Sequence, residues 1–172
     1  MSLKLAVGDP LPSVGLRATD GYLLNLRTFV TKQPAMILFF GAPTLKAAGR
    51  RRGLKAIEAL AKGHERLHQA GIAAVGISCD SEEQQSEFLE EQKLPFLLLS
   101  DERRSAVEVL GIDTVADGEN VNVVQPVALA VDRDGIVRSI IERMDPDTLV
   151  DQVVQALSEP IPAAAEDAST GS

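Results

Sequence analysis

The side chain best suited to nucleophilic chemistry is Cys79, the only cysteine among the 172 residues of the chain. It follows the apolar run IAAVGIS, which predicts a buried strand, and sites in open α/β sheets form at the carboxyl ends of strands. The Ser81 N–H and the start of a following helix could activate the thiol. We favour a structural cysteine instead, because free cysteines are mostly buried and the neighbouring Asp80 would raise the pKa of the thiol.

Two histidines, His64 and His68, stand four residues apart in a segment of helical periodicity, where both could reach one metal ion. The chain has no further histidine, and Glu65 beside them belongs to no recognisable metal-binding motif. We therefore interpret the pair as part of a solvated helix face. No metal and no cofactor is predicted.

Cations concentrate in the segment KAAGRRRGLK of an otherwise acidic chain. If a helix begins near Lys46, its free N–H groups, together with Lys46 and Arg50, offer a place for an anion or an acidic partner. The alternative is a solvated surface, because three consecutive arginines spread over about 200° of a helix and cannot share one face.

Composition and charge bound the class of protein. The net charge of −8 and the pI near 4.8 argue against nucleic acid and anionic membranes as partners. No apolar run approaches the ~20 residues that span a bilayer, the N-terminus lacks a secretory signal, and a lone cysteine fits a reducing compartment, so we expect a cytoplasmic protein. One domain over 1–157 and a disordered tail over 158–172, rich in Pro, Ala and acids, are expected.

The elements that must position these residues follow from periodicity and turn signals. The segments predict, in order, a hairpin over 14–26, a strand over 35–41, a helix over 45–69, a strand over 72–78, a helix over 81–92, a strand over 95–100, a short helix over 102–110, a polar loop over 113–124, a strand pair over 126–132 and 136–142, and a helix over 145–157. This order predicts an α/β fold, with a central mixed sheet of about five strands flanked by helices and an N-terminal β-hairpin.

The acid-rich segment SEEQQSEFLEEQ could be interpreted as a patch for partners. The spacing of Phe88 and Leu89 instead indicates a surface helix with one buried stripe, and Ser81 is its expected N-cap.

Five segments, in order and spacing, resemble the peroxiredoxin branch of the thioredoxin-fold superfamily, the alkyl hydroperoxide reductase/thiol-specific antioxidant class. They are VGDPLPSVGLRATDG, AMILFFGAP, VGISCDS, LPFLLLSD and ALAVDRDGIVR, and the resemblance covers roughly residues 5–157. It implies a thioredoxin-like fold and, in the family, a thiol peroxidase that works as an antioxidant oxidoreductase. Fold alone does not establish function.

The resemblance also implies where the family's reactive groups would fall. Peroxiredoxins follow the central strand with P-x-x-x-T-x-x-C, and this pattern places Gly41 at the proline, Leu45 at the threonine and Ala48 at the reactive cysteine. Gly53 falls where one subfamily carries its resolving cysteine. All four residues depart from the family pattern.

The family's activating arginine falls at Gln125, which brings no positive charge to a thiol. Pro126 falls where thioredoxin-like proteins keep a cis proline beside the active site. The alternative for Pro126 is a trans proline that opens an edge strand.

Two functions follow from these residues. The first is a peroxiredoxin-like module that has lost the peroxidatic and resolving cysteines and binds or regulates, with an anionic small molecule or an acidic protein as partner at the vacated pocket. The second is a thiol-dependent peroxidase that uses Cys79 alone, with an external thiol or a second subunit resolving the sulfenic acid. A homodimer is expected from the resemblance.

Overall fold

The structure, a computed structural model, describes residues 5–40, 48–112, 114–117, 120–143 and 145–158. Its centre is a seven-stranded mixed sheet with the order β2-β1-β5-β4-β3-β8-β9. In that order the strands are β2 (Leu23–Asn25), β1 (Gly15–Ala18), β5 (Leu97–Ser100), β4 (Ala73–Ser78), β3 (Ala35–Phe39), β8 (Val127–Val131) and β9 (Val137–Ile141). The predicted α/β fold is confirmed. The expected count of about five strands is too low, because the N-terminal hairpin joins the sheet where β1 pairs with β5.

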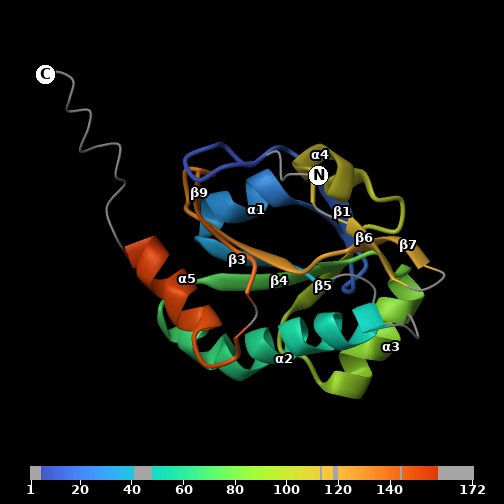
Figure 1. Ribbon diagram of the computed structural model, residues 1–172. Helices are drawn as coiled ribbons and strands as arrows, with labels where there is room; N and C mark the ends of the chain where they lie inside the picture. Colours follow the sequence, from blue (N-terminus) through green and yellow to red (C-terminus); the bar gives the residue numbers. More distant parts are fainter. Residues whose placement is uncertain (1–4, 41–47, 113, 118–119, 144, 159–172) are drawn as a thin grey trace, which may run out of the picture.

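Helices cover both faces of the sheet (Figure 1). One face carries α2 (Ala48–Gln69), α3 (Glu82–Gln92) and α5 (Leu149–Ser158), and the other carries α1 (Leu26–Lys32) and α4 (Ser105–Leu110). Strand β3 divides two hydrophobic clusters, since Ile37 and Phe39 face one of them and Met36 and Leu38 the other. All of β3 is buried, as a continuous apolar run predicts for a strand covered on both faces.

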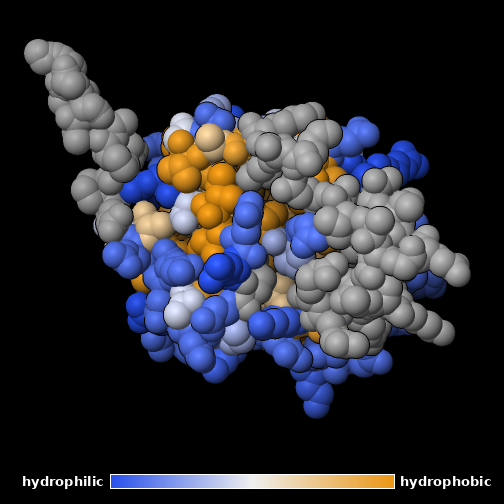
Figure 2. Space-filling view, in the orientation of Figure 1, coloured by the Kyte–Doolittle hydropathy of each residue, from blue (hydrophilic) through white to orange (hydrophobic). Residues whose placement is uncertain are grey.

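The space-filling view shows the surface on the side where α1 and β9 lie (Figure 2). Hydrophobic residues come to the surface there between hydrophilic ones. Ile140 on β9 and Phe29 on α1 are both half-buried and pack against the cluster on the α1 side of the sheet.

The N-terminal hairpin forms as predicted. Strands β1 and β2 pair antiparallel on either side of the turn that contains Asp20 and Gly21, and Gly21 adopts a φ of 91° that a residue without a Cβ tolerates. The other predicted strands and helices are confirmed to within a few residues, apart from the two regions described next.

Helix α1 was not predicted from the sequence, because Thr28, Val30 and Thr31 are β-branched and favour extended backbone. Two features outweigh this preference. Leu26 and Val30 are fully buried, and the Asn25 side chain accepts a hydrogen bond from the Thr28 N–H at 3.2 Å, which caps the helix.

The segment over 113–124, predicted to be a polar loop, instead contains β6 (Thr114–Asp117) and β7 (Asn120–Val124). These strands pair antiparallel as a ribbon separate from the main sheet. The prediction gave weight to the polar residues and too little to the β-branched ones, which favour strands.

The C-terminal helix prediction is confirmed from Leu149 onward. Asp145 organises the turn before it, because its carboxylate accepts from the Asp147 N–H at 2.9 Å and its carbonyl from the Leu149 N–H at 2.9 Å. Ser158, the first residue of the predicted tail, ends α5, and 159–172 lie outside the described residues. No helix in the described part of the chain is long and apolar enough to cross a membrane.

Candidate functional site

The candidate site lies at the sheet edge where β3, β4 and β5 end and β8 begins. Phe39 on β3 pairs with Ile77 on the parallel β4 and with Val127 on the antiparallel β8. Ser78 at the end of β4 pairs with Ser100 at the end of β5. The topology therefore brings the segments after β3, β4 and β5 to the same edge as the segment before β8.

Helix α2 begins at this edge, and its first turn contains no acidic residue. Among the predicted site positions, Gly41, Leu45 and Lys46 lie outside the described residues, and for Ala48 and Arg50 only the helical backbone is described. Ala48, where the resemblance places the family's reactive cysteine, is therefore the first residue of a helix.

Gly53 allows α2 to approach the end of β3 closely. A Cβ built at Gly53 would fall against the backbone carbonyl oxygen of Phe40. No flexible side chain is available to move aside, so a resolving cysteine at this position would require the helix and the strand to separate.

Gln125 and Pro126 come directly before β8, at the same edge as Phe40. Gln125 is half-buried and Pro126 is buried. The described residues contain no cis peptide bond, so the expectation of a cis Pro126 is wrong for this chain. The alternative, a trans proline at an edge strand, is also wrong in part, because β8 lies inside the sheet between β3 and β9.

Cys79 follows β4 directly and is partly buried against the cluster on the α1 and α4 side. Burial raises the pKa of its thiol from 9.0 to about 11. The positive charge of Arg104 opposes this rise, and the negative charges of Asp101 and Asp80 add to it. The thiol is thus held in its protonated, weakly nucleophilic form at neutral pH.

A network of buried polar side chains includes both sequence neighbours of Cys79. The Ser78 hydroxyl donates to Asp80 Oδ2 at 2.9 Å, and Gln85 Nε2 donates to Ser78 Oγ at 2.8 Å and to the Leu99 carbonyl at 2.6 Å. Within the described structure, Gln85 Oε1 has no hydrogen-bond partner. The network ties α3 to the ends of β4 and β5.

The Ser81 N–H, which the sequence suggested as an activator of Cys79, already has a partner. It donates to Gln84 Oε1 at 2.9 Å, while Ser81 Oγ accepts from the Gln84 N–H at 3.2 Å. This is a capping box, and it confirms Ser81 as the N-cap of α3. The N–H is therefore unavailable to stabilise a thiolate.

Asp101 and Arg104 are neighbours of Cys79 that the sequence analysis missed. The buried carboxylate of Asp101 accepts from the Ala106 N–H at 3.0 Å and the Val107 N–H at 2.9 Å, so it caps α4. Arg104 has a φ of 62°, in the left-handed region that few residues other than glycine adopt. The one available signal was the aspartate that ends LPFLLLSD just before a predicted helix.

His64 and His68 lie in the second half of α2, away from the carboxyl ends of the parallel strands where the candidate site lies. Their ring centroids are 6.4 Å apart, and the His64 ring is 5.7 Å from that of Phe96. Partial burial and the His68 charge lower the pKa of His64, and Glu65 raises it. Among the described residues, no group of three or more His, Cys, Asp or Glu side chains could hold a metal ion.

Comparisons of the sequence with known proteins identify its family. A family model described as the AhpC/TSA family matches residues 7–140. The chain is 27% identical over 162 residues to peroxiredoxin Bcp of Escherichia coli (strain K12), which covers 90% of this chain and 97% of that protein. It is 26% identical over 155 residues to the chloroplastic peroxiredoxin Q of Sedum lineare, which covers 90% of this chain and 78% of that protein.

Two solved structures show the same fold. Peroxidoxin BcpB from Mycobacterium tuberculosis has a TM-score of 0.73 and 20% identity, with coverage of 88% of this chain and 96% of that one. Peroxiredoxin Q of Xanthomonas campestris has a TM-score of 0.68 and 18% identity, with coverage of 84% and 89%. The thioredoxin-fold, peroxiredoxin-like architecture predicted from the sequence is confirmed.

Proposed function

Because this chain belongs to the AhpC/TSA family, we propose that it is a member without peroxidase chemistry of its own, which acts as a binding or regulatory module. The observation that carries the proposal is the position and state of the only cysteine. Cys79 follows β4 rather than beginning α2, and burial raises the pKa of its thiol to about 11.

The chemistry of peroxide reduction explains why this matters. A thiolate sulfur attacks one peroxide oxygen, the O–O bond breaks, and the leaving alkoxide or hydroxide takes up a proton, which leaves a sulfenic acid on the cysteine. Only the thiolate reacts, and at neutral pH a thiol with a pKa of about 11 is ionised in roughly one molecule in ten thousand. The small fraction of thiolate therefore makes Cys79 a slow nucleophile toward peroxide at neutral pH.

The alternative is a thiol-dependent peroxidase that uses Cys79 with an external thiol as reductant. One observation favours it, since the Arg104 charge lowers the pKa of Cys79. Burial, Asp101 and Asp80 all act in the opposite direction, with burial the largest of the four influences. The net rise in the pKa of Cys79 supports the binding or regulatory module over the peroxidase.

Peroxide consumption separates the two functions. The purified native chain and Cys79→Ser are given hydrogen peroxide or an alkyl hydroperoxide with excess dithiothreitol. We expect both proteins to match the rate of dithiothreitol alone. If the native chain consumes peroxide faster than that and Cys79→Ser does not, Cys79 is the nucleophile. That result would contradict the proposal that the chain lacks peroxidase chemistry.

The binding part of the proposal concerns the start of α2, where Gly41, Leu45, Ala48, Gln125 and Pro126 are the vestigial positions, joined by Gly53 further along the helix. We propose that Lys46 and Arg50 there bind an anionic small molecule or an acidic protein. The absence of acidic residues from the first turn of α2 supports this choice, because a helix N-terminus favours anions.

Inorganic phosphate is a suitable first probe for that site. We expect Arg50→Gln to weaken phosphate binding, measured by calorimetry. Arg66→Gln is the matched control, because Arg66 lies near the other end of α2 and pairs with Asp151. Equal weakening by both variants, or no binding to the native chain, would contradict an anion site at the start of α2.

A homodimer, a single domain over 1–157 and a cytoplasmic location complete the proposal. The dimer is supported by the family resemblance, and the location by the single unpaired cysteine. Sedimentation velocity across a range of concentrations tests the dimer, and a single monomeric species throughout would contradict it.

A further inference from the structure

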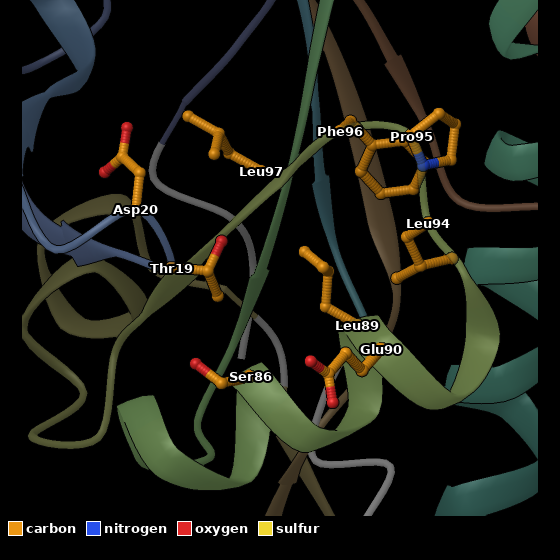
Figure 3. Close-up of a pocket in the computed structure, with 9 residues that line it drawn as sticks. All are labelled: Thr19, Asp20, Ser86, Leu89, Glu90, Leu94, Pro95, Phe96 and Leu97. Carbon is orange, nitrogen blue, oxygen red and sulfur yellow. The ribbon is translucent and has the colours of Figure 1, made fainter.

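A hollow lies at the opposite end of β5 from the candidate site (Figure 3). Its volume is about 560 Å³, within the range of roughly 300–1,000 Å³ that is usual for ligand pockets. One wall is α3, a second is the segment that enters β5, and the third is the turn between β1 and β2. We call it the α3 cleft.

The walls of the α3 cleft are fixed by backbone hydrogen bonds. On one side, the Thr19 N–H donates to the Leu98 carbonyl at 3.0 Å and the Leu98 N–H to Thr19 Oγ1 at 3.3 Å. On the other, α3 ends at Gln92, and the Leu94 N–H donates to the Leu89 carbonyl at 3.1 Å. The cleft is therefore preformed and does not depend on a loop closing.

The floor of the cleft is apolar and lies between the two hydrophobic clusters. Leu89 and Leu94 pack against the cluster on the α2 side, and Leu97 packs against the other. All three side chains are only half-buried, so they leave apolar surface exposed in the hollow. The sequence predicted a buried stripe through Phe88 and Leu89. That is confirmed for Phe88, whereas Leu89 also faces the cleft.

The rim of the cleft is acidic. Asp20 from the turn and Glu90 from α3 both line it, and Glu82 lies on the same stripe of the helix as Ser86 and Glu90 at spacings of four. The sequence of α3 contains no lysine or arginine.

Two cations stand near the cleft. Lys93 follows the last residue of α3, and Arg17 donates from Nη1 to the Gly21 carbonyl at 3.3 Å. Neither forms an ion pair with Asp20 or Glu90 among the described residues. An apolar floor with carboxylates on its rim complements a ligand that is apolar and positively charged.

We propose that the α3 cleft binds a segment of a partner protein in which an aliphatic side chain lies next to a lysine or arginine. The aliphatic side chain covers Leu89, Leu94 and Leu97, and the cation lies between Asp20 and Glu90. Both carboxylates are exposed, so the cleft suits side chains offered from outside rather than a molecule that must be enclosed.

The proposal does not depend on the presence or absence of peroxide chemistry. The cleft uses Leu94, Leu97 and the turn at Asp20, whereas the candidate site lies beyond Ser100 at the other end of β5. Binding at the cleft and peroxide consumption can therefore be measured and can fail separately.

The test is a titration of the ¹⁵N-labelled full chain followed by amide chemical shifts. The probe is the hexapeptide acetyl-Leu-Lys-Leu-Leu-Lys-Leu-amide, and the same peptide with glutamate in place of lysine is the charge control. We expect saturable shifts at Thr19, Ser86 and Leu97 with the basic peptide, and binding at least five-fold weaker with the acidic one.

Glu90→Gln and Asp20→Asn should each raise the dissociation constant of the basic peptide several-fold. Asn at position 20 keeps the oxygen that accepts from the Tyr22 N–H at 3.1 Å, so the turn is preserved. Glu91→Gln is the matched control, because it removes the same charge from the next residue, about 100° further around the helix. It should leave binding unchanged.

Several results would overturn the proposal. Shifts confined to other surfaces, equal binding of the acidic peptide, or equal weakening by Glu91→Gln would show that no specific cleft interaction exists. Concentration-dependent shifts at Thr19, Ser86 and Leu97 without peptide would make a second copy the occupant. Equally tight binding of n-hexylammonium would make the cleft a small-molecule site.

Discussion

Helices α2 and α3 begin at the same edge of the sheet but differ in the charge of their first turns. Helix α3 has a complete capping box between Ser81 and Gln84, and Glu82 and Glu83 occupy its first turn. Helix α2 has no acidic residue in its first turn and begins at Ala48, where the resemblance places the family's reactive cysteine. The described N-terminus of α3 is thus capped and acidic, whereas the first turn of α2 carries no acidic residue.

Burial is the main cause of the raised pKa of Cys79, and the N-terminus of α3 is not arranged to offset it. A helix start stabilises a thiolate through free N–H groups and the positive end of its dipole. At α3 the N–H groups of Ser81 and Gln84 are already hydrogen-bonded, and two glutamates oppose a further negative charge. Cys79 therefore lies just before a helix whose N-terminus does not stabilise a thiolate.

Moving the thiol from one helix start to the other should produce the largest effect. In the Cys79→Ser background, we expect a thiol introduced by Ala48→Cys to react with iodoacetamide at neutral pH about 100-fold faster than Cys79 does in the native chain. This ratio follows from an ordinary pKa of 9.0 against about 11, and the dipole of α2 would increase it. Alkylation rates are measured by mass spectrometry.

Unfolding provides the control for this comparison. In concentrated guanidinium chloride the two thiols should react at similar rates, because the fold no longer distinguishes them. Equal rates in the folded proteins would show that the two helix starts do not differ in the way proposed.

The raised pKa of Cys79 also predicts how stability depends on pH. Below its ordinary pKa of 9.0 the thiol is protonated in both states. Between about pH 9 and pH 11 the unfolded chain loses this proton while the folded chain keeps it, so the free energy of unfolding falls as pH rises. At 1.36 kcal/mol per pKa unit, with allowance for partial exposure, the loss is roughly 2 kcal/mol.

Urea denaturation of the native chain and of Cys79→Ser, from pH 8 to pH 11, isolates this contribution, because all other groups titrate in both proteins. The difference between the two stabilities should shrink or reverse as pH rises. A difference independent of pH would mean that the folded and unfolded thiols have the same pKa.

Close packing of α2 against the end of β3 should reverse the usual effect of a glycine-to-alanine substitution on helix stability. Replacing glycine by alanine inside a helix normally gains about 1 kcal/mol. We expect Gly53→Ala to lose roughly 1–2 kcal/mol instead, because overpacking costs about 1–3 kcal/mol and the new Cβ meets the Phe40 backbone. Chemical denaturation measures the change.

Glu58→Ala, at an exposed position of the same helix, is the control and should change stability by less than about 0.5 kcal/mol. A gain in stability from Gly53→Ala would show that α2 can move away from β3 at little cost, and a resolving cysteine would then be sterically possible there.

Local patterns predicted the parts of the fold that local chemistry decides. The apolar runs of β3 and β4 indicated buried strands, and Asp20 with Gly21 indicated the hairpin. Helix α1 could not be predicted in this way, because it depends on the burial of Leu26 and Val30 against distant strands.

At the candidate site, too, the sequence predicted only the influence of residues adjacent to Cys79. Asp80 is its sequence neighbour, so its effect on the thiol was predicted with the correct sign. Asp101 and Arg104 lie more than twenty residues away in sequence and reach Cys79 only because β4 and β5 pair in parallel. The α3 cleft was missed for the same reason, since its walls come from three separate segments.

The smallest effect should come from the cap that distinguishes α3 from α2. Ser81→Ala removes the oxygen that accepts from the Gln84 N–H at 3.2 Å and should cost about 1 kcal/mol of unfolding free energy. Ser86→Ala, exposed on the same helix, removes a hydroxyl without touching the cap and should cost far less. Because the Ser81 N–H can still bond Gln84, the reactivity of Cys79 should stay unchanged in Ser81→Ala. If that variant instead made Cys79 markedly more reactive, the cap would be what keeps the α3 N-terminus away from the thiol, and Cys79 would be a latent nucleophile rather than a structural residue.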